Sequence, residues 1–242
     1  MKIITLNTWG GRVSQIDAFI LSHASDVDIF CFQEVHAKKT KEADISQKER
    51  PEFFEELQKL LPDFLGIFTE QVPHTGLAIF VRNNLEIEQM DSYVLLSADE
   101  LLPPQNYPRI VQAITLKDPH ITILNFHGTP GGEKKDSPQR EKQMDRLHKV
   151  LNRYTTEKIL LGDFNLRPDT KAISGIENIM RNLVIEHGIK TTRTKLYKKK
   201  DEMPFADYIF VTSKINVNEF KVLEDEVSDH MPLYLDFTYH KI

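Results

Sequence analysis

Short runs rich in β-branched and aromatic residues recur along almost the whole chain and are separated by turn signals. Strands of roughly four to eight residues have this composition. The predicted strands are 2–9, 28–35, 77–82, 110–116, 121–127, 158–166, 207–212 and 233–239. Apolar residues at helical spacing predict helices at 14–24, 51–61, 137–154 and 171–188. Strands that alternate with helices predict an α/β or α+β domain.

The length of 242 residues fits one large domain or two small ones. No linker rich in Gly, Ser or Pro divides the chain, and no repeat of about 20–50 residues is present. We therefore expect a single domain over residues 1–242, acting as a monomer. No apolar run approaches the ~20 residues that a membrane span needs, so we expect no membrane partner.

The only cysteine, Cys31, lies inside an apolar run, so no disulfide can form within the chain. This fits a reducing compartment, and we expect a cytoplasmic protein in which Cys31 packs as a small buried residue. The polar segment from His36 to Arg50 is expected to be a surface loop.

The net charge of −5 argues against a protein that grips many phosphates of duplex DNA, because such binding usually needs a basic surface. One local basic run, KTTRTKLYKKK at 190–200, is an exception. It is more simply interpreted as a solvated loop than as an arm that meets phosphates.

Polar residues stand where the predicted strands end or begin. These residues are Asn7, Gln33, Glu34, His127, Asp163, Asn165, Asp207, Ser228, Asp229 and His230. Each alone is more simply a turn former, a solvated acid or a structural histidine. Together they predict a site, because ligands of α/β folds bind at strand ends. Carboxylates and amides without a cysteine cluster suit Mg²⁺ or Mn²⁺, and histidines added to them suit phosphoester hydrolysis.

The stretch LLGDFNL at 160–166 shows the choice between these interpretations. Asp163 and Asn165 could form an ordinary turn or cap the next helix. They could equally be reacting groups that an apolar strand holds in a fixed position, because small displacements of catalytic groups cost rate. The stretch alone leaves both alternatives open.

The ordered motifs TLNTW, FQEV, NFHG, LGDFNL, ADYIFV and VSDHMPL resemble the endonuclease/exonuclease/phosphatase superfamily, which has the DNase I-like fold. The resemblance spans nearly the whole chain. It implies a four-layer sandwich of two packed mixed β-sheets flanked by helices, with the active site where loops of both sheets meet. It also implies a Mg²⁺-dependent phosphoesterase, with Mn²⁺ as a possible substitute.

The same resemblance implies roles for residues at the strand ends. Glu34 corresponds to the metal-binding glutamate, and Asn7 and Asp229 to positions that complete or support the metal site. Asp163 corresponds to the aspartate that orients or deprotonates the attacking water. Asn165 would hold the phosphate and that aspartate.

Two histidines complete the implied set. His230 corresponds to the histidine that contacts a phosphate oxygen and transfers protons, and Asp207 to its hydrogen-bonded acid. His127 corresponds to a second histidine found in some branches. Arg109 resembles, more loosely, an arginine that contacts the substrate phosphate. Arg167 could also meet a phosphate, or could be an ordinary surface arginine.

Three functions remain open at this point. The first choice is a phosphodiesterase acting on a nucleic acid or nucleotide by in-line attack of an activated water. The second is a phosphatase acting on a small phosphorylated molecule such as an inositol phosphate. The third is a catalytically inactive binding module, which the intact acidic and histidine set disfavours.

Overall fold

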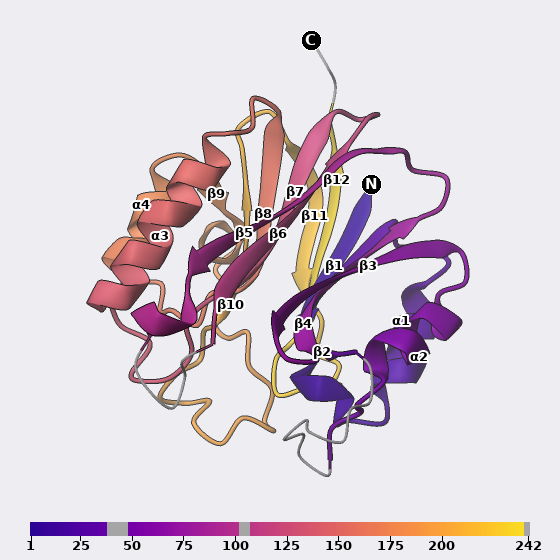
Figure 1. Cartoon of the computed structure of the whole chain (residues 1–242), viewed down its shortest axis with the longest axis horizontal. Helices are drawn as coiled ribbons and strands as arrows, with labels where there is room; N and C mark the ends of the chain where they lie inside the picture. The colour runs from indigo at the N-terminus through magenta and orange to yellow at the C-terminus, as the bar shows by residue number, and fades with distance from the viewer. Residues whose placement is uncertain (38–47, 102–106, 240–242) are drawn as a thin grey trace.

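Two six-stranded sheets form the centre of the computed structural model, which describes residues 1–37, 48–101 and 107–239 (Figure 1). In order across the first sheet, the strands are β11 (Asn216–Val222), β12 (Leu233–Thr238), β1 (Lys2–Asn7), β2 (Ile29–His36), β4 (Thr75–Arg82) and β3 (Phe64–Val72). The second sheet has the order β5 (Ile87–Leu96), β6 (Arg109–Leu116), β7 (Ile121–His127), β8 (Glu157–Asp163), β10 (Asp207–Val211) and β9 (Arg181–Asn182). Both sheets are mixed, because β1 pairs with β2 and β7 with β8 in parallel while the other pairs are antiparallel.

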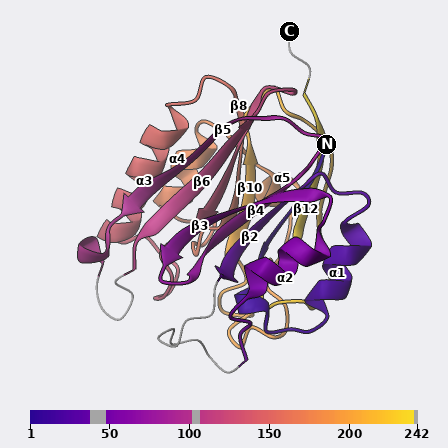
Figure 2. The same cartoon turned by 45° about the vertical axis from the view of Figure 1, so that its right-hand side comes forward.

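Helices cover the outer face of each sheet, which gives the predicted four layers (Figures 1 and 2). The first sheet carries α1 (Ile16–His23) and α2 (Phe53–Leu60), and the second carries α3 (Pro138–Leu151) and α4 (Lys171–Glu177). The short elements are α5 (Leu183–Glu186) and the 3₁₀ turns η1 (Trp9–Gly11) and η2 (Ala98–Glu100). The predicted fold class is confirmed.

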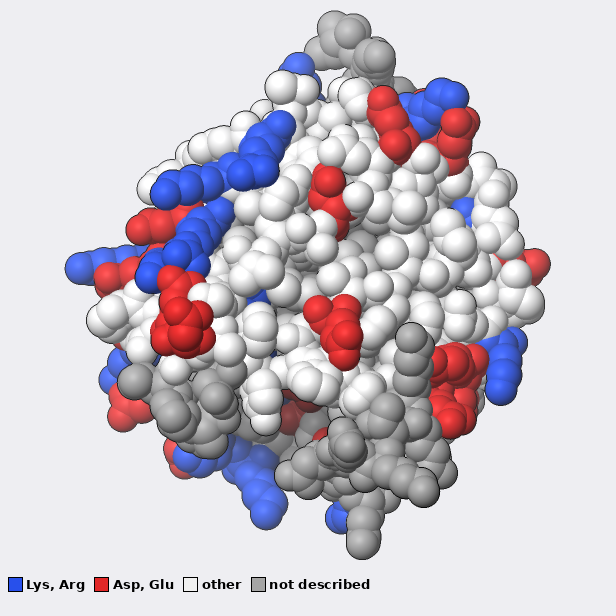
Figure 3. Space-filling model, in the orientation of Figure 1, with Lys and Arg blue, Asp and Glu red and all other residues white. Residues whose placement is uncertain are grey.

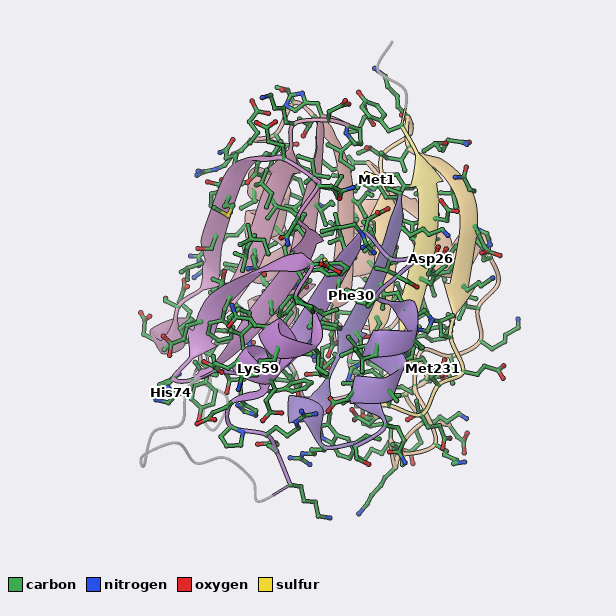
Figure 4. The ribbon with its side chains drawn as sticks, turned by 90° about the vertical axis from the view of Figure 1, so that its right-hand side faces the viewer. Met1, Asp26, Phe30, Lys59, His74 and Met231 are labelled. Carbon is green, nitrogen blue, oxygen red and sulfur yellow. The ribbon has the colours of Figure 1, made fainter. Side chains whose placement is uncertain are left out.

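The strands near the middle are apolar on both faces because each face meets a different core. In β2, Cys31 faces the core between the sheets, whereas Phe30 and Phe32 pack under α1 and α2. Phe30 is labelled in Figure 4. Since side chains alternate along a strand, two buried faces require a continuous apolar run. Cys31 is fully buried as predicted, and its burial raises the pKa of the thiol.

A buried polar link ties the sheets together close to the strand ends. The Gln33 side-chain amide donates to Asn125 Oδ1 at 2.7 Å, and the Asn125 amide donates to the Phe32 carbonyl at 3.1 Å. Gln33 therefore joins the two sheets, directly beside Glu34.

Two parts of the predicted secondary structure need correction. The strands that were not predicted are β3, β5, β9 and β11, which are the outer strands of the two sheets. The helix expected over 171–188 is broken into α4, β9 and α5. Of the expected loop at 36–50, residues 38–47 lie outside the described residues, and His36 ends β2. In the described part of the chain, no helix is both long and apolar enough to cross a membrane.

Candidate active site

The register of the second sheet brings three of the predicted site residues side by side. His127 ends β7 opposite Asp163 at the end of β8, and Asp207 begins β10 opposite the same Asp163. Asn7 ends β1 in the first sheet, which packs against this sheet. The strand ends of both sheets therefore meet at one edge, the lower edge in Figure 1.

Asp163 is the best-anchored acid of this edge. Its Oδ1 accepts a hydrogen bond from the Asn165 backbone at 2.8 Å, and its Oδ2 accepts from the side-chain amides of Asn7 at 2.9 Å and Asn165 at 3.1 Å. Burial raises its pKa, but the charges of His230, His127, Arg193 and Lys134 outweigh burial, so the pKa lies below its usual range. Asp163 is therefore an ionised carboxylate in a fixed position.

The residue before Asp163 must be glycine. Gly162 has a φ of 126°, and a Cβ there would lie 2.2 Å from the Phe126 carbonyl oxygen. Asn165, two residues after Asp163, also has a left-handed backbone with a φ of 53°. The LLGDFNL stretch thus combines a buried strand, an obligatory glycine and a tight turn that returns the Asn165 amides to Asp163.

Asn7 holds the two central carboxylates together. Its side-chain amide donates to Glu34 Oε1 at 3.0 Å and to Asp163, while its own Oδ1 accepts from the Trp9 backbone at 3.0 Å. The Glu34 side chain is 37% exposed. Burial raises the pKa of Glu34 above its usual value, and the hydrogen bond from Asn7 offsets only part of this rise.

These carboxylates fit a hard divalent ion. Ligand atoms of Glu34, His127 and Asp163 all lie within 4.8 Å of one another. Mg²⁺ retains several waters and needs only one or two protein carboxylates. Glu34 and Asp163 supply these, and the partial exposure of Glu34 leaves room for the waters. Asp229 lies at the same edge, with Oδ2 3.4 Å from Arg193 Nη1 and Oδ1 3.8 Å from His230 Nε2, and its charge contributes to raising the pKa of Glu34.

His230 uses both ring nitrogens. Nδ1 lies 2.8 and 2.9 Å from the two oxygens of Asp207, so the expected pairing with this acid is present. Nε2 contacts the Arg193 guanidinium, which can only donate. Nε2 therefore accepts, and the ring carries its proton on Nδ1. Burial and Arg193 lower the pKa of His230, but Asp207, Asp163 and Asp229 together raise it above the ordinary value.

His127 is a different kind of histidine. Its Nε2 lies 3.7 Å from both Glu34 Oε1 and Asp163 Oδ2 and makes no hydrogen bond. Burial lowers its pKa to about 3, although the charge of Asp163 acts in the opposite direction. The ring is therefore neutral near pH 7.

Unpartnered buried nitrogen atoms, three of them on cationic donors, gather around the central acid. In the part of the chain that the structure describes, nine buried side-chain atoms lack a hydrogen bond, and four of them are His127 Nε2, Arg109 Nε, Lys134 Nζ and Arg193 Nε. The charges of Arg109, Lys134 and Arg193 each interact with that of Asp163. Buried donors normally find acceptors, so this cluster marks a place for an anion.

Lys134 and Arg193 were not predicted as site residues. Lys134 is 3% exposed in the loop after β7, and burial lowers its pKa to about 8, opposed by Asp163. Arg193 belongs to the basic run at 190–200, yet it too is 3% exposed and forms an antiparallel bridge with His230. The simpler interpretation of the basic run as a solvated loop is therefore wrong for Arg193, which is buried. No sequence signal separated Arg193 from its lysine neighbours.

The two arginines that were predicted to meet phosphate have different surroundings. Arg109 is buried, and burial lowers its pKa to about 10 against the charges of Glu34 and Asp163. The Arg167 guanidinium instead pairs with Asp169 at 3.1 Å.

Backbone strain concentrates at this edge. Among the described residues, the non-glycine residues with positive φ are Trp9, Glu34, His74, Lys134 and Asn165. All except His74 belong to the site or its loops. Such conformations cost about 1–3 kcal/mol each and persist where the surroundings impose them, commonly at functional sites.

The two-sheet α/β sandwich thus carries acids, histidines and unpartnered cations at one edge, and comparison with known proteins shows to which family the chain belongs. Residues 4–230 match the Endonuclease/Exonuclease/phosphatase family, and the chain belongs to this family. Its members are phosphoester hydrolases that generally depend on a divalent metal. No curated protein sequence matches the chain.

Solved structures show the same fold at low sequence identity. The mannosyl-6-phosphatase of Bacteroides thetaiotaomicron is 18% identical with a TM-score of 0.73, covering 99% of this chain and 100% of that one. The human Nocturnin catalytic domain with a bound sulfate anion is 19% identical with a TM-score of 0.67, covering 99% and 93%. A humanized D. rerio TDP2 is 14% identical with a TM-score of 0.70, covering 98% of both chains.

Proposed function

We propose that this protein is a divalent-metal-dependent phosphodiesterase that acts on a nucleic acid or nucleotide. The observation that carries the proposal is the set of unpartnered donors around the ionised Asp163. A phosphate group would accept from these donors, while Asp163 would stay free to bind the attacking water. An inactive binding module would not need an ionised acid at the centre of an anion site.

The roles of the chain's own residues follow from their surroundings. Asp163 orients the water and takes its proton, and Asn165 holds Asp163 and a phosphate oxygen. Neutral His127 contacts a phosphate oxygen or assists the leaving group. The Asp207–His230 pair does the same with His230 protonated on both ring nitrogens, a form that its raised pKa favours. Glu34 would hold the metal ion, with Asn7 and Asp229 supporting that site. The ion, when bound, would supply positive charge to the phosphate oxygens.

Cations on the other side of the phosphate would neutralise its charge. Arg109, Lys134 and Arg193 would contact the non-bridging oxygens, because each presents a buried donor without a partner. Binding of the substrate phosphate would break the contact between Arg193 and His230, so that both side chains could contact the substrate. Arg167 remains a predicted phosphate contact, although Asp169 is its partner here.

A second candidate is a phosphatase that removes phosphate from a small molecule. Lys134 and Arg193 favour it, since these additional cations would suit the second negative charge of a phosphate monoester. One structural neighbour is described as a mannosyl-6-phosphatase.

The test is hydrolysis of a panel in Mg²⁺: single-stranded and duplex DNA, RNA, a 5′-tyrosyl oligonucleotide, inositol phosphates, sphingomyelin and simple aryl mono- and diesters. We expect turnover of a nucleotide diester that the Asp163→Asn variant lacks. Exclusive turnover of monoesters would transfer the assignment to the phosphatase. No turnover of any phosphoester by a folded, Mg²⁺-supplied protein would refute both.

A further inference from the structure

A hollow of about 510 Å³ opens beside the proposed site. Its apolar walls come from Trp9, Leu196, Tyr197 and Met203. Lys198 and Lys199, both exposed, also line it. Small-molecule pockets are commonly about 300–1,000 Å³ and largely apolar with a few polar groups, so this hollow has the size and the lining of a ligand site.

The hollow adjoins the groups that would bind phosphate. Asp229 lines it and contacts Arg193 at 3.4 Å. The Tyr197 ring lies 4.2 Å from the Arg193 guanidinium carbon and 5.3 Å from Lys134 Nζ. Tyr197 is thus a wall shared by the hollow and the two cations, and a molecule whose phosphate meets these cations would extend into the hollow.

The walls are held in place by local contacts. The Arg12 guanidinium lies 4.7 Å from the Trp9 ring, and Trp9 itself has a left-handed backbone anchored by its hydrogen bond to Asn7. The Tyr197 hydroxyl donates to Met203 Sδ at 3.7 Å. A preformed aromatic surface of this kind loses little freedom when a flat ring packs on it.

We propose that the hollow binds the aromatic base of the nucleotide whose phosphate lies at the site, and that Lys198 and Lys199 meet a neighbouring phosphate. This inference rests on the proposed function and specifies its substrate. Trp9 and Tyr197 can stack on any base, because every base has a π face, so the hollow would select for a base without selecting its sequence. The two exposed lysines carry positive charge that is complementary to the phosphate of the next nucleotide in a nucleic acid.

The first experiment compares three diesters with the same scissile chemistry in Mg²⁺. They are the thymidine dinucleotide and its two analogues in which one base, at either position, is replaced by hydrogen. We expect loss of one of the two bases to lower kcat/KM about five- to a hundredfold, the range for stacking of one base. Equal kcat/KM for all three diesters would overturn the inference while leaving the phosphodiesterase assignment intact.

Variants then locate the effect. Leu196→Ala combined with Met203→Ala should lower kcat/KM on the complete dinucleotide toward that on its base-free analogue and leave the rate on the analogue unchanged. The matched control is Ile179→Ala with Ile185→Ala, which removes exposed apolar side chains from a separate hollow. This control should keep the full preference for the base. A preference that survives in the Leu196/Met203 variant would overturn the inference.

A binding measurement keeps the inference testable if no diester is cleaved. Trp9 is the chain's one tryptophan, so its fluorescence reports on the hollow directly. Thymidine 5′-phosphate should quench it, and 2-deoxyribose 5-phosphate, which has no base, should not. Equal effects of the two phosphates, or none from either, would overturn the proposed base site. Selective quenching without any turnover would support the hollow and count against the proposed function alone.

Discussion

Replacing Asp207 with asparagine would test how the two ring nitrogens of His230 are used. At present Nδ1–H donates to the Asp207 carboxylate at 2.8 Å, and Nε2 accepts from Arg193. The variant's amide can turn its NH₂ toward Nδ1, which moves the ring proton to Nε2 and against the Arg193 donor. Asp207→Asn therefore keeps the shape of the site but sets a ring proton against the Arg193 donor, and it removes one of the charges that raise the pKa of His230.

The expected loss has a lower and an upper bound. One buried, charge-assisted hydrogen bond is worth about 1.5–3 kcal/mol, which corresponds to roughly 10–100-fold in rate. A complete loss of acid–base assistance by His230 costs about 10²–10⁴-fold. Since the substitution removes the bond and also displaces the proton, we expect kcat/KM to fall by about 10²–10⁴-fold.

The assay is steady-state hydrolysis in Mg²⁺ for Asp207→Asn, His230→Ala and the double variant. Residues that act as one unit give losses that do not multiply, so the double variant should be little slower than His230→Ala. Asp201→Asn, the same change at an exposed position, is the control and should retain activity. If the two losses multiply, Asp207 and His230 act independently and the role given to Asp207 is wrong.

Three further predictions concern metal, charge and pH. Hydrolysis should require millimolar-range Mg²⁺ or Mn²⁺ and vanish in EDTA, because the site offers oxygen ligands and no thiolate; full activity in chelator would contradict the proposed metal site. Lys134→Met should lower kcat/KM about 10–100-fold while raising the thermal midpoint, because it removes a buried amine without a partner; a lower midpoint would indicate a structural role. Burial raises the pKa of Glu49, but its bonds to His36 and Arg12 prevail and lower it from 4.5 to about 2. The Glu49 contacts therefore stabilise the fold above pH 4.5 and lose this effect as the pH falls toward 2. Glu49→Gln should cost about 1–2 kcal/mol in urea unfolding at pH 7 and less at pH 3, and an equal cost at both pH values would be inconsistent with this ion pair.

The inner strands could be predicted from the sequence and the outer strands could not. β2 and β8 are buried on both faces, so their residues form continuous apolar runs. β5 is an edge strand that is mostly exposed, and it reads IEQMDSYVLL, which lacks such a run. The predicted helix over 171–188 has apolar residues at helical spacing, but residues 181 and 182 pair with β10 as a further edge strand. Tertiary pairing determined the structure of that segment.

The carboxylates and histidines of the site stand next to predictable strands, so their convergence could be anticipated from the motifs. Lys134 and Arg193 come from irregular loops, and only the three-dimensional arrangement shows that they are buried beside Asp163. The prediction grouped Arg193 with solvated lysines, because the burial of a single residue in a basic run gives no periodic pattern in the sequence. Hydrophobic patterning identifies strands and helices, whereas long-range charge contacts such as that of Arg193 with His230 depend on the packed loops.

The most direct test of the central claim follows the oxygen atom of water during hydrolysis. A nucleotide diester is cleaved in H₂¹⁸O with Mg²⁺, and the masses of the phosphate and alcohol products are measured by mass spectrometry. Asp163→Asn is the matched variant. Attack of an Asp163-oriented water on phosphorus predicts one ¹⁸O in the phosphate product, none in the alcohol, and no labelled product from the variant. Label in the alcohol, or undiminished labelling of phosphate by Asp163→Asn, would contradict the account.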